Sequence, residues 1–155
     1  MNAFRKTTYI ALLCLLCTSP AVALAAKCAG TNINNTVTWS PTEIVKDMKL
    51  SILRFTSVIV SDDPSAPFHL VSGECVGSFL ISLDGKTSSS GYCARKDKDG
   101  DVLNEEWAAS GGGVGTSKLV GGTGKFAKAA GAAQFRHTPA YGTTAVVRWT
   151  GECQF

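Results

Sequence analysis

The stretch of residues 68–96, FHLVSGECVGSFLISLDGKTSSSGYCARK, decides the fold of this chain. Two runs of strand-forming residues flank Leu83-Asp84-Gly85-Lys86, and Asp-Gly is a strong signal for a tight hairpin turn. The pattern predicts two antiparallel strands, residues 68–82 and 87–96. Cys75 and Cys93 lie about equally far from this turn, so they should nearly face each other across the hairpin.

Turn signals recur about every ten residues on both sides of the hairpin, which is the spacing of an antiparallel meander. Asp97–Asp101, Gly111–Gly113 and Gly121–Gly124 are the predicted turns on its C-terminal side. Further strands are predicted at residues 31–39, 46–60, 102–108, 116–120, 132–137 and 143–155.

The first two of these strands depend on short apolar patterns. Ile33, Val37 and Trp39 alternate with polar neighbours and predict a strand that ends at Ser40-Pro41. Residues 46–60 fit both a strand period and a helix face, but the β-branched run Val58–Val60 favours a strand.

About eight strands with no helix between them indicate an all-β fold. A closed antiparallel barrel is the preferred prediction, because closure removes the exposed edges of a flat sheet. A β-sandwich of two packed sheets is the alternative.

Residues 1–25 have the composition of a secretory signal peptide. Arg5 and Lys6 precede an apolar run, and Ala23-Leu24-Ala25 supplies the small residues of a cleavage site. The run is too short for a membrane anchor, and Lys27 before Cys28 does not fit a lipidation site. The sequence therefore predicts a periplasmic or secreted protein with one domain at residues 26–155.

The predicted mature domain carries four cysteines in an oxidising compartment, so two disulfides are expected. Three pairings are possible. The hairpin favours Cys75 with Cys93, which leaves Cys28 and Cys153 near the two ends of the domain. A zinc site is disfavoured, because no CxxC pair lies in residues 26–155.

The charge balance argues against a nucleic-acid partner. Loss of Arg5 and Lys6 lowers the formal net charge from +3 to +1, and no basic stripe remains. The densest charge run, residues 95–99, alternates in sign and is typical of a solvated loop.

The segment Leu119-Val120-Gly121-Gly122-Thr123-Gly124-Lys125-Phe126-Ala127, with Gly131 after it, resembles the GGTGKF segment of the allene oxide cyclase and dirigent barrels. It is also similar to that of small uncharacterised bacterial secreted proteins in which a DxDGD turn precedes it, here residues 97–101. The resemblance implies a calycin-like eight-stranded barrel and carries no catalytic residue onto this chain. Gly121, Gly122 and Gly124 are expected to serve a structural turn.

No residues form a recognisable catalytic or cofactor site. Asp97, Asp99 and Asp101 alternate as in the first half of a calcium loop, but Val102 and Ala108 occupy positions where that loop needs Gly and Glu. An acidic hairpin turn is the preferred interpretation. His69 and His137 could act as bases, yet surface positions are expected for both.

Trp39, Trp107 and Trp149 each lie on a predicted strand, where aromatic rings either fill a barrel or line a ligand cavity. The leading hypothesis is a non-enzymatic barrel that binds a small apolar ligand or an envelope partner, without a cofactor. The alternatives are a cyclase-like or dirigent-like enzyme acting on an unsaturated substrate, and a secreted inhibitor acting by surface contact.

Overall fold

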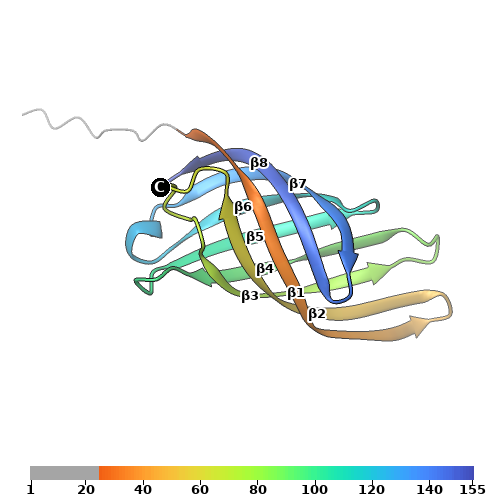
Figure 1. The fold of residues 1–155 in the computed structure, drawn as a ribbon. Coiled ribbons are helices and arrows are strands. Elements are labelled where there is room, and N and C mark those ends of the chain that lie inside the picture. The colour runs from red at the N-terminus through yellow and green to blue at the C-terminus, as the bar shows by residue number, and fades with distance from the viewer. Residues whose placement is uncertain (1–24) are drawn as a thin grey trace, which may run out of the picture.

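The computed structural model describes residues 25–155, which form eight strands and one short 3₁₀ helix (Figure 1). The predicted signal peptide lies outside the described residues, apart from Ala25. The elements, in chain order, are β1 Ala26–Val45, β2 Met48–Ser61, β3 Ser72–Ile81, β4 Thr87–Lys96, β5 Val102–Ser110, β6 Val114–Gly122, η1 Gly124–Phe126, β7 Ala130–Tyr141 and β8 Thr144–Gln154.

Each strand pairs antiparallel with the next, and β8 returns to pair with β1, so the sheet is a closed barrel. Gly30 of β1 lies opposite Trp149 of β8 in this closing pair. The predicted barrel is confirmed, and the sandwich alternative is wrong, because no pair of facing sheets exists when every strand has two neighbours.

The β3–β4 hairpin has the predicted turn. Ser82 N–H donates to the carbonyl of Lys86, and Gly85 N–H donates to the carbonyl of Ser82. Cys75 and Cys93 are direct cross-strand partners, 4.0 Å apart at Cα, and their disulfide faces the barrel interior. A second disulfide joins Cys28 of β1 to Cys153 of β8 across 125 residues, so both favoured pairings are confirmed.

One end of the barrel is plugged by apolar side chains. The segment after β2 folds over this end, where Phe68 and Val71 are buried and Phe68 stacks on Phe155, with 5.1 Å between ring centroids. Residues 68–71 are therefore a turn and not the start of a strand, which corrects the prediction. Leu70 marks the reversal with a positive φ of 61°.

Two neighbouring turns are locked together at the same plugged end. The Lys125 ammonium forms an ion pair with Asp97 and lies 3.8 Å from Asp99, while Lys125 N–H donates to Asp101 at 3.1 Å. A Cβ atom at Gly124 would lie 1.9 Å from Asp101 Oδ1, so only glycine fits at this contact. The acidic turn and the glycine-rich turn therefore form one structural unit.

The first strand differs from its prediction in length and in facing. β1 runs through Pro41, because it pairs with β8 only as far as Asn35 and is an edge strand beyond that point, where proline costs no ladder hydrogen bond. Ile33 and Val37 are exposed, whereas Asn32 and Asn34 turn inward. As far as Val37, the predicted apolar face of this strand is therefore its outer face.

A register shift between Thr36 and Thr38 reverses the alternation of β1. A bulge of this kind inserts one unpaired residue, here Val37, and so changes which residues face inward. Thr36 and Trp39 both line the lumen as a result, although they are three positions apart.

Aromatic rings lie over inward glycines on the neighbouring strands. The indole of Trp107 covers Gly77 and Gly91, where a Cβ atom would lie 2.7 and 2.6 Å from Cζ2 of the ring. Trp149 covers Gly30 in the same way. These glycines leave the space that lets large rings pack inside a narrow barrel.

Candidate ligand cavity in the barrel lumen

The lumen holds a cavity of about 300 Å³ on the side away from the plug. It lies toward the end where the β1–β2 and β3–β4 hairpins extend beyond the other strands (Figure 1). Five aromatic side chains form much of its wall: Trp39, Phe55, Phe79, Trp107 and Phe135. A volume of this size is at the lower end of the range for small-molecule pockets.

A buried ion pair lies where the cavity meets the plugged half of the lumen. Arg95 of β4 is 1% exposed, and its Nη1 donates to Oε2 of Glu105 on β5 at 2.5 Å. Its Nε and Nη2 donate to the Ser57 hydroxyl at 3.2 and 3.1 Å, and Nη2 lies 3.8 Å from Cys75 Sγ. Arg95 is therefore no solvated loop residue, which corrects the prediction for the charge run at residues 95–99.

A second, smaller cavity of about 30 Å³ lies on the plugged side, and its apolar wall includes Phe68, Leu103 and Phe155. Trp149 and Asn32 also line it, and Trp149 Nε1 donates to Asn32 Oδ1 at 2.9 Å. Side chains fill this half of the barrel, so ligand-sized space exists only in the other half of the described lumen.

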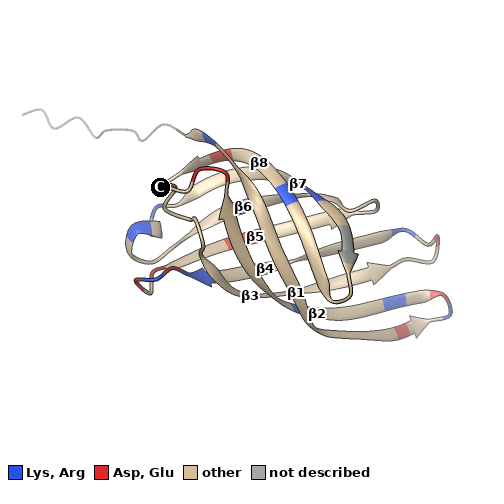
Figure 2. Ribbon diagram, viewed as in Figure 1, with Lys and Arg blue, Asp and Glu red and all other residues tan. Residues whose placement is uncertain are grey.

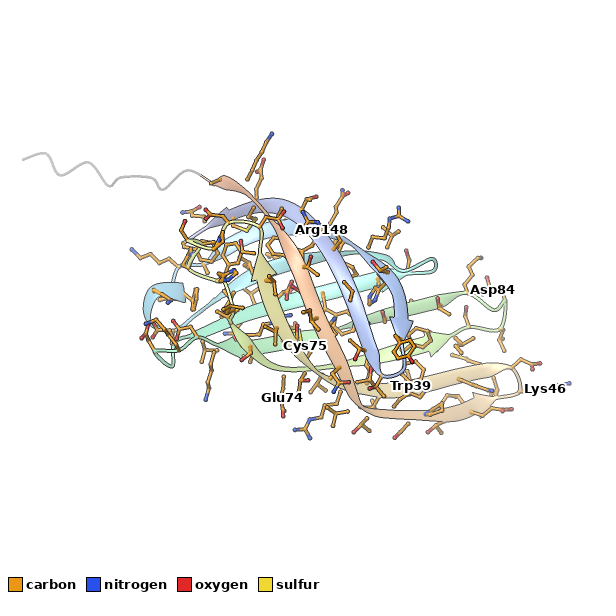
Figure 3. All side chains as sticks on the ribbon, in the orientation of Figure 1. Trp39, Lys46, Glu74, Cys75, Asp84 and Arg148 are labelled. Atoms are coloured by element: carbon orange, nitrogen blue, oxygen red, sulfur yellow. A yellow bond between two sulfur atoms is a disulfide. The ribbon has the colours of Figure 1, made fainter. Side chains whose placement is uncertain are left out.

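The structure separates the three tryptophans that the sequence groups as ligand-binding candidates. Trp107 and Trp39 both line the larger cavity, and Trp39 packs on Phe79 at the mouth with 4.9 Å between ring centroids (Figure 3). Trp149 borders only the smaller cavity and belongs to the buried core. The lumen therefore brings two of the three candidates to one site.

His137 of β7 also lines the larger cavity, beside Phe135 with 5.7 Å between ring centroids. Its side chain is partly exposed at the mouth, and desolvation of the covered part by the wall lowers the pKa of the imidazole below its usual value. The neutral ring therefore predominates at pH 7. His69, by contrast, is half-buried, which differs from the expected surface position.

The acidic turn lies apart from the cavity, at the plugged end, and Asp97 and Asp99 already have the ammonium of Lys125 as their cation. The hydrogen bond from Lys125 lowers the pKa of Asp97, so this carboxyl stays ionised. Within residues 25–155, no three His, Cys, Asp or Glu side chains converge as metal ligands.

Arg95, Glu105 and Asn34 are the polar cavity residues used in the argument below that the sequence analysis did not select. A period-two signal could have found two of them, because Arg95 follows the inward Cys93 by two positions and Glu105 precedes the inward Trp107 by two. The other charged groups gather mainly at turns and strand ends, as Figure 2 shows.

The fold is similar to that of several solved structures. The pterocarpan synthase dirigent protein GePTS1 matches with a TM-score of 0.54 and 17% identity over 88% of this chain and 95% of that chain. A protein with unknown function from Clostridium acetobutylicum matches with a TM-score of 0.57 and 8% identity over 84% and 99%. The pterocarpan synthase dirigent protein PsPTS1 matches with a TM-score of 0.47 and 17% identity over 84% of this chain and 95% of that chain.

The structural similarity to the first two proteins shows a shared fold alone, because the sequence identities are low. The expected dirigent-like barrel is confirmed at the level of the fold. No family model and no curated protein sequence matches this chain. In the part of the chain that the structure describes, no helix is long and apolar enough to cross a membrane.

Proposed function

We propose that this protein binds one small, largely apolar molecule in the larger cavity of the barrel lumen. The cavity itself carries the proposal: about 300 Å³ of space, walled by aromatic rings and bounded by a polar ion pair. Pockets that combine apolar walls with a few fixed polar groups are typical of small-molecule sites. The inner disulfide is part of this wall, since Cys93 lines the cavity, and a disulfide stabilises a fold mainly by constraining the unfolded chain.

The site of action that fits this role lies outside the cytoplasm. Residues 1–25 have the pattern of a cleaved signal peptide, and disulfides such as Cys28–Cys153 and Cys75–Cys93 persist in oxidising compartments. Residues 26–155 are then the mature domain, in the periplasm or in the medium.

Native mass spectrometry of the exported protein, followed by organic extraction, tests the proposal. A bound apolar compound at one molecule per chain is the expected result. Ala109 lines the cavity, so Ala109→Trp should fill the lumen and abolish the bound mass. Ala108 is exposed on the outer surface, and Ala108→Trp is the matched control that should retain it. An empty wild-type barrel that takes up no apolar compound would reject the proposal.

A dirigent-like role is the second candidate, and the similarity of the fold to GePTS1 favours it. In that role the cavity would orient an unsaturated, reactive substrate, and positioning would supply most of the effect. Glu105 and His137 are the side chains on the described cavity wall that could serve as proton acceptor or donor to a bound substrate.

The two roles differ in turnover. A dirigent-like protein converts an unsaturated substrate to one product isomer, and Ala109→Trp should remove this selectivity while Ala108→Trp keeps it. Glu105→Gln should lower the rate without removing binding. A simple binder converts no substrate: the wild type and Ala108→Trp return the bound compound unchanged, and Ala109→Trp binds none.

A further inference from the structure

Two buried polar atoms of residues that line the larger cavity have no hydrogen-bond partner. They are Nε1 of Trp107, a donor, and Oδ1 of Asn34, an acceptor. Both residues line the cavity, Trp107 from β5 and Asn34 from β1, which lie on opposite sides of the eight-stranded barrel. A ligand in the lumen therefore lies between them.

An unpaired buried polar group destabilises the fold, and it calls for an explanation. The plugged half of the same lumen pairs the same two residue types, because Trp149 Nε1 donates to Asn32 Oδ1. Arg95 is likewise paired with Glu105 and Ser57. Two further buried atoms without a hydrogen-bond partner, His69 Nδ1 and Asp97 Oδ2, lie in the turns at the plugged end, and the Asp97 carboxylate has its ion pair with Lys125. Among the residues that line the described lumen, the unpaired donor and acceptor belong to the part that has room for a ligand.

The charges around the cavity oppose an ionised ligand. Arg95 and Glu105 neutralise each other, so an anion entering the cavity gains no free cation, and the Glu105 carboxylate would repel it. His137 at the mouth is mostly neutral at pH 7, because burial lowers its pKa. Burying a carboxylate without a partner costs more than burying a neutral polar group.

We infer that the cavity selects an uncharged apolar molecule with two hydrogen-bonding groups, one that accepts from Trp107 Nε1 and a hydroxyl that donates to Asn34 Oδ1. This inference rests on the proposed function, since it specifies the ligand class of the same cavity. Trp107 and Asn34 are then the residues that determine specificity, whereas Trp39 and Phe79 contribute apolar contact.

Four matched probes test this selection by calorimetry on the full chain with both disulfides formed. Naphthalene offers no hydrogen bond, 2-methoxynaphthalene accepts only, 6-methoxy-2-naphthol accepts at one end and donates at the other, and 2-naphthoate is an anion. The expected order of affinity is methoxynaphthol, methoxynaphthalene, then naphthalene, with about a five- to tenfold step for each hydrogen bond and no measurable naphthoate binding.

Two variants assign the steps to residues. Trp107→Phe should remove the advantage of methoxynaphthalene over naphthalene, and Asn34→Leu should remove the advantage of methoxynaphthol over methoxynaphthalene. Trp39→Phe is the matched control, because Trp39 also lines the cavity but is not one of the unpaired buried donors. In this variant the affinity for every neutral probe should fall by the same factor. If Trp107→Phe does not fold, the order of affinity of the four probes for the wild type still tests the inference.

The outcomes separate the two proposals. Equal affinity for naphthalene and methoxynaphthol, or tightest binding of naphthoate, would overturn the inference and leave the lumen binding site standing. Failure of all four probes to bind, or binding that survives Ala109→Trp, would overturn the proposed function and the inference with it.

Discussion

Arg95 and Glu105 form an ion pair inside the barrel, with 2.5 Å between Nη1 and Oε2. The two residues come from adjacent strands, and the guanidinium also reaches the Ser57 hydroxyl of β2. Together they separate the filled half of the lumen from the half that has space. The pair is therefore both part of the core and part of the candidate site.

Removal of one partner of this pair should destabilise the barrel strongly. Glu105→Leu leaves the Arg95 charge buried and unpaired, and we expect a loss of about 3 to 5 kcal/mol in the free energy of unfolding. Urea titration measures this loss. The double variant Arg95→Met/Glu105→Leu removes both charges and should recover part of it; a double variant as unstable as the sum of the two single variants would contradict the pairing.

Gly91→Ala should be poorly tolerated, because the added Cβ would lie 2.3 Å from the Val76 carbonyl and 2.6 Å from the Trp107 ring. We expect about 1 to 3 kcal/mol of destabilisation, together with a changed near-ultraviolet circular dichroism signal from the displaced indole. Gly111→Ala is the control, since its nearest neighbouring atom lies at 3.7 Å. Equal stability of the two variants would rule out this close approach.

Asp84 at the β3–β4 turn should make stability depend on pH in the acid range. The ammonium of Lys86, then the Ser82 hydroxyl and the Lys86 N–H, lower the pKa of Asp84 from 3.8 to about 2. A carboxyl with a depressed folded-state pKa stabilises the fold above pH 3.8 and loses this contribution as the pH falls toward 2.

The measurement is the stability difference between the wild type and Asp84→Asn across this range. It should be constant from pH 7 to about pH 5 and shrink between pH 4 and pH 2. Carboxyl titration by NMR gives the pKa directly. A midpoint near 3.8 for Asp84 would show that the turn contacts do not hold in solution.

The two disulfides should contribute unequally to stability. In the loop-entropy account, closing the 125-residue separation of Cys28 and Cys153 stabilises by about 5 kcal/mol, and closing the 18-residue hairpin of Cys75 and Cys93 by about 3 kcal/mol. Paired Cys→Ala variants of each bridge, compared in urea, test the order. The reverse order would mean that core packing of the inner bridge outweighs chain entropy.

Calcium should not bind at the acidic turn, because Lys125 already supplies the cation for Asp97 and Asp99. Isothermal titration calorimetry at millimolar calcium is expected to show no heat. Saturable heat that disappears in Asp97→Asn would show that the ion displaces the ammonium.

Local signals in the sequence were enough to predict the strand order and both disulfides. The Asp84-Gly85 turn places Cys75 opposite Cys93 by simple counting, and the β-branched run Val58–Val60 recovers β2 despite its helix-like alternative. Turn chemistry and alternation depend on neighbouring residues only, so a single sequence contains them.

The lumen was harder to predict, because on part of its wall polar side chains face inward and apolar side chains face outward. Asn34 faces inward and Ile33 outward, and the bulge at Val37 then changes which residues face the cavity. Arg95 belongs to a run of charges that looks solvated until Glu105 and Ser57 are placed beside it. Such partners come from other strands, and only the folded barrel brings them together.

The glycines beneath the tryptophan rings suggest how this lumen can change through evolution. A ring and the glycine that it covers are contributed by different strands, so the ring can be replaced while the glycine stays. Loss of the Trp107 ring would add empty space over Gly77 and Gly91, which would remain glycines because a Cβ atom at each would still lie 2.3 Å from a backbone carbonyl, of Ser90 and of Val76 respectively. Homologous barrels with the same hydrogen-bonded frame can therefore hold differently shaped molecules.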